Sequence, residues 1–156
     1  LNIAEHIGLM EKIPVAVFSL EMGKQQLAER FLCSISEIDS QKVRRGLLSD
    51  SGYKKLANAC AELSEAPIFI DDTPALSIFE FRAKCRRLKQ RYDIQAVVID
   101  YLQLMTGTKD SGSREQEVSN ISRSLKSVAK ELDIPIIALS SPVDSTIITV
   151  VEVYSQ

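Results

Sequence analysis

Four short apolar runs, separated by segments of helical length, constrain the fold of this chain more than any other feature. Each run has the length of a strand, is rich in β-branched residues and shows little polar alternation, as expected of strands buried on both faces. The runs are PVAVFSL (14–20), PIFIDD (67–72), AVVID (96–100) and IPIIALS (134–140). Such strands require a sheet that is covered on both sides.

The segments between these runs have the spacing of amphipathic helices. One of them opens with Ser77 and has Glu80 three residues later, a capping-box signature. The apolar residues that recur there at steps of three and four are Ile78, Phe81, Cys85, Leu88 and Tyr92. The expected helical segments are 1–12, 23–35, 51–63, 77–92 and 113–132. Strands joined by such helices predict an α/β fold with right-handed crossovers, a parallel sheet and helices on its faces.

Two of the expected helical segments place apolar residues on one face, where we expect them to contact the core. These are Ile3, Ile7 and Met10 in the first segment, and Tyr53, Leu56, Ala59 and Cys60 in the third. They follow only from helical periodicity.

Composition narrows the class of protein. The chain has 156 residues without an internal repeat or interdomain linker, which predicts one domain over 1–156. Three widely spaced cysteines (Cys33, Cys60 and Cys85) favour small buried thiols over a disulfide framework or a zinc site. These cysteines suit a reduced, cytoplasmic protein, and because no apolar run is long enough to cross a bilayer we expect no membrane partner. The net charge of −2 gives no global attraction to nucleic acid. The chain begins at Leu1 within a helical pattern, and we expect it to be a fragment of a longer protein.

Polar residues gather where the apolar runs end. They are Glu21, Asp71, Asp72, Asp100, Ser140 and Ser141. In parallel α/β sheets, ligands bind beyond the carboxyl ends of the strands, so this edge is the expected site. The alternative is that these acids are simply solvated at strand ends.

Six separated motifs resemble, in the same order, the bacterial replicative DNA helicases of the DnaB type. They are VFSLEM, IDDTP, RAKCRRLK, VVIDYLQLM, REQEVSNISRSLK and IPIIALS, and the resemblance extends over residues 1–140. It implies a truncated RecA-like ATPase core that belongs to a hexameric, ATP-hydrolysing ring on single-stranded DNA. A RecA-like recombinase or clock-type ATPase shares this fold but is less similar at DYLQLM and SRSLK.

The resemblance also implies roles for individual residues. Asp100 resembles the Walker B acid, which acts through magnesium and its water shell, and Glu21 resembles the glutamate that polarises the attacking water. Lys109 and Arg114 lie in and beside the loop that, in the family, faces the DNA channel. The basic residues of the segment 77–92 could also contact DNA, although a charged outer helix face is usually just solvated.

Two departures from the family pattern limit what these residues can do alone. No GxxxxGK[ST] phosphate-binding motif occurs among the 156 residues. After residue 140 the tail (141–156) diverges from the family, although its alternation is strand-like. We therefore expect this chain alone to bind no ATP or magnesium firmly and not to hydrolyse ATP.

Two functional classes follow. In the first, the chain is a motor fragment whose partners are single-stranded DNA and other helicase subunits. In the second, it is a noncatalytic RecA-like module that binds a helicase subunit, a helicase loader, primase or another replication partner. The missing phosphate-binding motif favours the second class for the chain alone, whereas the retained Glu21 and Asp100 favour descent from the first.

Overall fold

A single five-stranded sheet organises the computed structural model, which describes residues 1–100, 102, 105–106, 114–140 and 147–151. The strands are β1 (Val15–Ser19), β2 (Ile68–Asp71), β3 (Ala96–Asp100), β4 (Ile136–Ser140) and β5 (Ile147–Val151). Their order is β2-β1-β3-β4-β5. The first four strands are parallel, which confirms the expected α/β sheet, and all four apolar runs form strands. The strand-like part of the tail forms β5, which pairs antiparallel with β4.

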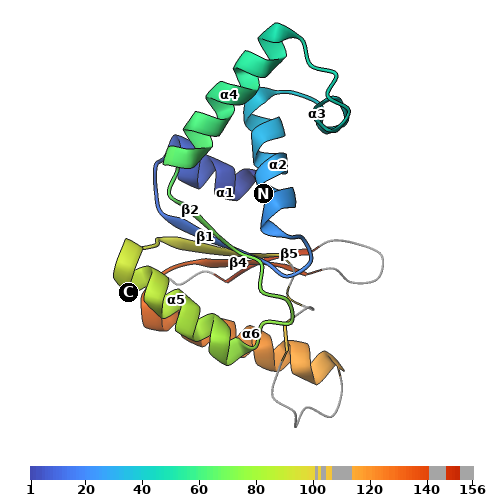
Figure 1. Cartoon of the computed structure of the whole chain (residues 1–156). Coiled ribbons are helices and arrows are strands. Elements are labelled where there is room, and N and C mark those ends of the chain that lie inside the picture. The colour runs from blue at the N-terminus through green and yellow to red at the C-terminus, as the bar shows by residue number, and fades with distance from the viewer. Residues whose placement is uncertain (101, 103–104, 107–113, 141–146, 152–156) are drawn as a thin grey trace.

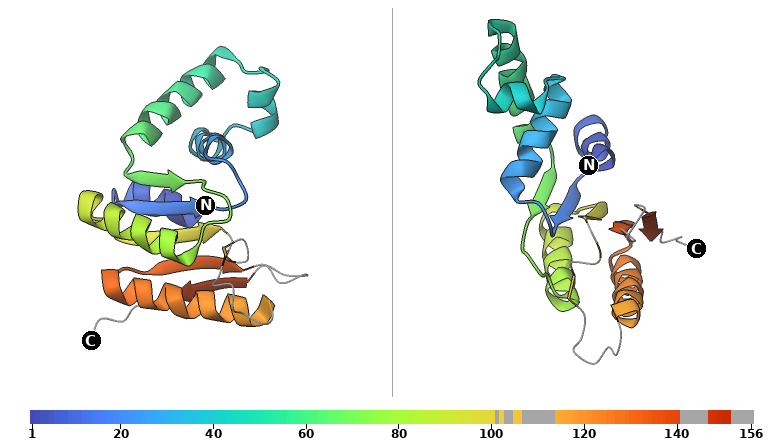
Figure 2. Two further views of the ribbon diagram at one scale, coloured as in Figure 1. Left: turned by 60° about the horizontal axis from the view of Figure 1, so that its bottom comes forward. Right: turned by 90° about the vertical axis from the view of Figure 1, so that its right-hand side faces the viewer.

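Helices cover both faces of this sheet (Figure 1). They are α1 (Asn2–Glu5), the π-helix η1 (His6–Met10), α2 (Lys24–Ser36), α3 (Ser40–Arg44), α4 (Asp50–Glu65), α5 (Ile78–Tyr92) and α6 (Arg114–Leu132). Helices α5 and α6 lie along one face, and α1 and α2 lie on the other. Helix α4 packs on α2 and extends away from the sheet (Figure 2). No helix in the described part of the chain is both long and apolar enough to cross a membrane.

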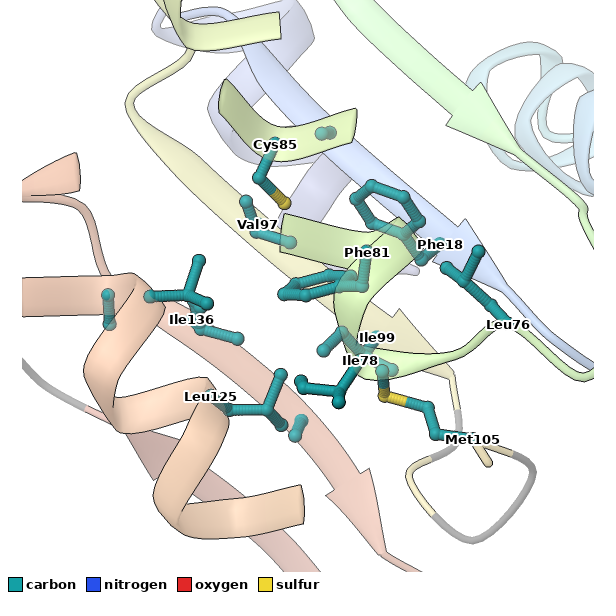
Figure 3. Packing of buried hydrophobic residues seen from close by; sticks show 14 of the residues in the cluster. Phe18, Leu76, Ile78, Phe81, Cys85, Val97, Ile99, Met105, Leu125 and Ile136 are labelled. Carbon is teal, nitrogen blue, oxygen red and sulfur yellow. The ribbon is translucent and has the colours of Figure 1, made fainter. Parts of the chain in front are cut away.

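The larger core lies between the sheet and helices α5 and α6. Phe18 on β1 and Phe81 on α5 meet edge to face with ring centroids 4.8 Å apart, and both side chains are fully buried (Figure 3). Ile99 on β3 and Leu125 on α6 belong to the same cluster. The predicted capping box fixes the start of α5, since Ser77 and Glu80 exchange hydrogen bonds. This packing holds the ends of β1 and β3 in place.

The predicted core faces of two helices were partly wrong. Tyr53 is 53% exposed and Cys60 is also exposed, because α4 packs mainly on α2, so that Ala59 is its buried residue. Ile3 and Met10 are exposed as well, and the opening segment buries Ala4, Gly8 and Leu9 instead. Small residues allow a close approach there: a Cβ atom on Gly8 would lie only 2.3 Å from Cγ1 of Ile68.

The three cysteines differ in their surroundings. Cys85 is fully buried on α5, and this burial raises the pKa of its thiol. Cys33 is half-buried on α2, whereas Cys60 is exposed on α4. The expectation of three buried thiols was therefore wrong for Cys60.

Candidate functional site

The carboxyl ends of β1 and β3 bring two acidic residues to one edge of the sheet. In the parallel register, Ser19 pairs with Asp100, the last residue of β3. The backbone then makes one more inter-strand bond, from the N–H of Leu20 to the carbonyl of Asp100 at 2.8 Å. Glu21 follows directly after this bond. Two neighbouring strands therefore place Glu21 and Asp100 at the same edge, as the sequence predicted.

A serine that the sequence analysis did not single out holds the turn that carries Glu21. Ser19 is only 1% exposed, and its Oγ accepts a hydrogen bond from the N–H of Met22 at 3.2 Å. This bond closes the chain around Glu21, whose own side chain is exposed. The available signal was a hydroxyl residue at the end of an otherwise apolar strand, because a buried hydroxyl needs a partner.

Asp71, at the end of β2, is held by an ion pair. Its Oδ2 accepts a hydrogen bond from Nζ of Lys84 on α5, and its Oδ1 accepts one from the N–H of Thr73 at 3.0 Å. Lys84 also donates to the hydroxyl of Thr73 at 2.8 Å. Burial raises the pKa of Asp71, but the hydrogen bonds from Lys84 and Thr73 outweigh it and hold the pKa below its ordinary value. Asp71 is thus a charged structural residue.

The side chain of Asp72, the next residue, also has a hydrogen-bond partner within the protein. Its Oδ2 accepts the N–H of Lys24, the first residue of α2, at 2.9 Å. The residue before α2 is Gly23, which has no side chain to cap the helix, so Asp72 supplies the acceptor from a distant segment. Its negative charge also suits the positive end of the helix dipole.

Glu21 and Asp100 differ from these two residues. Within the described ranges, neither side chain makes a hydrogen bond or an ion pair, and Asp100 is half-buried. No group of three or more potential metal ligands occurs among those residues either. The available carboxylate of Asp100 fits one protein ligand of a Mg²⁺ ion that keeps several of its waters, and it is not part of a complete protein cage.

The chain beyond Asp100 is fixed to the segment before α5. Leu102 and Met105 are buried, and Thr106 donates its N–H to the carbonyl of Leu76 and its hydroxyl to that of Ala75, both at 3.2 Å. Thr106 therefore lies close to the beginning of α5.

The other predicted site residues are less completely placed. Lys109 and Ser141 lie outside the described residues. Arg114 is the first residue of α6, and Ser140 is the last residue of β4, at the same end of the sheet as Asp100. The side chains of Arg114 and Ser140 are not among those described.

Comparison with known proteins identifies relatives over most of the chain. Residues 1–142 match the DnaB-like helicase C terminal domain family. The chain is 49% identical over 141 residues to the replicative DNA helicase DnaC of Bacillus subtilis and 50% identical over 141 residues to the replicative DNA helicase DnaB of Geobacillus stearothermophilus. Each alignment covers 90% of this chain and 31% of the relative, so the chain spans about a third of their length.

Solved structures agree with these matches. One of them, an ATPase domain, superimposes with a TM-score of 0.81 at 35% identity, covering 88% of this chain and 50% of that one. A DnaB-like replicative helicase, whose interactions with primase were studied, gives a TM-score of 0.77 at 36% identity over 83% of this chain and 33% of that one. The expected RecA-like fold is thereby confirmed.

Proposed function

Because this chain belongs to the DnaB-like helicase C terminal domain family, we propose that it forms the central part of the ATP-hydrolysing motor of a replicative DNA helicase. The observation that carries this proposal is the pair of carboxylates, Glu21 and Asp100, at the ends of adjacent parallel strands, without side-chain partners among the described residues. The other acids of this edge, Asp71 and Asp72, are occupied by contacts within the protein. The edge thus has both structural acids and acids available to a ligand.

The two available carboxylates have distinct proposed roles. Asp100 ends a buried strand and would hold the water shell of a magnesium ion. When bound with nucleotide, that ion neutralises charge on the phosphates. Glu21 is exposed on a turn that Ser19 closes, and its carboxylate would accept a hydrogen bond from a water molecule and orient it for attack on the terminal phosphate.

Phosphate binding is the function that these residues do not supply. The sequence contains no GxxxxGK[ST] motif, whose backbone amides and lysine would hold the triphosphate. We therefore expect ATP and magnesium to bind weakly to these 156 residues and firmly only when a phosphate-binding loop is joined to them. By themselves they should not hydrolyse ATP.

DNA and protein partners complete the proposal. Lys109 and Arg114, in and beside the segment that precedes α6, would contact the backbone of single-stranded DNA without reading bases. Neighbouring copies of the domain would form a hexameric ring, with primase or a helicase loader as further partners in the cytoplasm.

Calorimetric titration with ATP and magnesium tests the proposed site. We would compare the chain with a version joined at its amino end to the phosphate-loop segment of a relative such as the Geobacillus stearothermophilus helicase. The expected result is tight binding by the joined version only. Hydrolysis by that version should be lost in Glu21→Gln and in Asp100→Asn but retained in Glu62→Gln. Glu62 is a suitable control because it is exposed on α4, away from the sheet.

The same experiment separates the second functional class. If neither version binds nucleotide although both are folded, the motor proposal fails, and a noncatalytic module that binds replication proteins becomes the better interpretation. A separate titration with fluorescent oligothymidylate tests the DNA contact. Lys109→Ala with Arg114→Ala should weaken binding and reduce its dependence on salt, and unchanged binding would remove both residues from the DNA site.

A further inference from the structure

A groove lies between the edge strand β2 and helix α5, away from Glu21 and Asp100. Its volume is about 510 Å³. Phe69, Leu88 and Tyr92 give it an apolar floor, and the rings of Phe69 and Tyr92 stack with centroids 4.3 Å apart. Lys84, Arg87 and Arg91 line it as well. The groove therefore combines apolar surface with positive charge.

The backbone of β2 forms one wall of this groove, and its outer side is unpaired within the described chain. Strand β2 is the first strand in the order of the sheet and pairs only with β1. The N–H of Val15 bonds to the carbonyl of Pro67, so in the alternating parallel ladder the polar groups of Phe69 and Asp71 face β1. The backbone N–H and C=O of Ile70 then point away from β1, toward the open edge of the sheet. An edge of this kind can accept an additional strand.

The basic residues of α5 divide into two groups. Arg82 and Arg86 both contact Glu131 on α6, and Lys89 pairs with Asp93. In contrast, Arg87 and Arg91 are exposed and make no ion pair with any described residue, although Arg91 lies over the ring of Tyr92 at 5.2 Å.

Within the groove itself, Lys84 is neutralised by Asp71. Among the described residues, the uncompensated charge of the groove is therefore that of Arg87 and Arg91, one helical turn apart. An anionic ligand could therefore pair with the guanidinium groups of both arginines.

We propose that this groove binds an extended acidic segment of a partner protein, which adds to β2 as a strand. Arg87 and Arg91 are four residues apart on a helix, a rise of about 6 Å. Two side chains on the same face of a strand are two residues apart, about 6.6 Å. A segment with acidic residues at positions i and i+2 would place one carboxylate near each arginine.

The observations favour a peptide over a nucleic acid. The outward backbone groups of β2 match those of an extended peptide and not those of a phosphodiester chain. Phe69 and Tyr92 already stack on each other, so their facing surfaces are not open to bases.

A fluorescein-labelled peptide, Val-Glu-Val-Glu-Val-Glu, is the probe, and fluorescence anisotropy at low ionic strength is the measurement. The double variant Arg87→Glu with Arg91→Glu should weaken binding by at least about tenfold, because attraction is replaced by repulsion at both positions. The matched control, Lys54→Glu with Lys55→Glu, makes the same charge change on the exposed side of α4 and should leave binding unchanged. Circular dichroism confirms that each variant is folded.

Changes in the peptide test the strand pairing without altering the protein. The same peptide with N-methyl groups at its third and fourth residues keeps the charge but loses one backbone donor on each edge of the strand and should bind much more weakly, and Val-Lys-Val-Lys-Val-Lys should not bind. Equal binding of the N-methylated peptide, or equal binding to the Arg87 and Arg91 variant, would overturn the proposal. If oligothymidylate, but not the acidic peptide, loses binding in that variant, the groove is a nucleic-acid site and the proposal is wrong.

Discussion

Two pairs of acidic residues lie near the carboxyl ends of the strands, and they differ in what their side chains contact. Asp71 and Asp72 accept hydrogen bonds from Lys84, Thr73 and the start of α2. Glu21 and Asp100 have no such side-chain partners among the described residues. Residue type and strand position are alike in the two pairs, so position at a strand end does not by itself identify a ligand-binding acid. The difference lies in which distant segment reaches each carboxylate.

All four acidic residues depend on an intact sheet. The largest loss of stability is therefore expected from a substitution inside a strand and not at its end. Val98 is 5% exposed in the middle of β3, beside β1 and β4. Val98→Asp would bury an unpaired charge among apolar side chains and should unfold the domain, a loss above about 4 kcal/mol. Circular dichroism during urea denaturation measures this. A folded Val98→Asp protein with normal stability would contradict the assignment of β3 as a buried strand.

Among the edge residues, Asp71 should matter most for stability. Asp71→Ala removes the partner of Lys84 and should cost about 1–2 kcal/mol in the free energy of unfolding at neutral pH. Because the folded pKa of Asp71 lies below its unfolded value, the ion pair stabilises the fold above about pH 4, and this contribution is lost as the pH falls through the folded pKa.

Urea denaturation at several pH values tests both parts of this prediction. The difference between the wild-type chain and Asp71→Ala should shrink as the solution is acidified below about pH 4. A double-mutant cycle with Lys84→Met isolates the pair. A pH-independent difference would mean that packing, and not charge, explains the effect of the substitution.

Asp72 should have a smaller effect, confined to one helix end. Asp72→Ala removes the acceptor for the N–H of Lys24 and should destabilise the protein by about 0.5–1 kcal/mol. Asp72→Asn retains an acceptor oxygen and serves as the control, with about half of this loss or less. If the alanine variant is as stable as the asparagine variant, Asp72 does not cap α2 in solution.

Glu21→Gln and Asp100→Asn should change stability least, by less than about 0.5 kcal/mol each, because neither side chain has a partner to lose among the described residues. Their proposed effect is on nucleotide hydrolysis by the motor that includes a phosphate-binding loop. Thermal melts of the two variants test the stability. A substantial loss for Asp100→Asn would show that its carboxylate has a structural role like that of Asp71, and the contrast between the two pairs would disappear.

The buried strands were predictable because continuous apolar runs have few alternatives in a chain of this size. Helix faces were harder to predict, since periodicity shows which residues lie together but not whether anything packs against them. Tyr53 and Cys60 are exposed because α4 leaves the sheet, and Ile3 is exposed because the opening segment packs through Gly8. Helix α3 was missed altogether, although Asp39 caps it, because five residues are too few to show a period.

The sequence likewise predicted the positions of the candidate site residues along the strands but not the contacts of their side chains. Topology placed Glu21 and Asp100 at one edge of the sheet, because parallel strands in a βαβ fold end together. The sequence around Asp71 does not predict its ion pair, because its partner Lys84 is 13 positions away. Predicting the pair would require knowing which side of α5 faces the end of β2. The role of Ser19 also required the turn geometry around Met22.

The unequal burial of the three thiols provides a built-in reporter of opening of the fold. A thiol-reactive dye should modify Cys60 at once, whereas Cys85, enclosed between α5 and the sheet with a raised pKa, should react only when that core opens. In a protein with both Cys33→Ser and Cys60→Ser, the rate of Cys85 labelling would follow the separation of α5 from the strands that carry Glu21 and Asp100. A slower rate in the presence of a ligand would report binding without any measurement of catalysis.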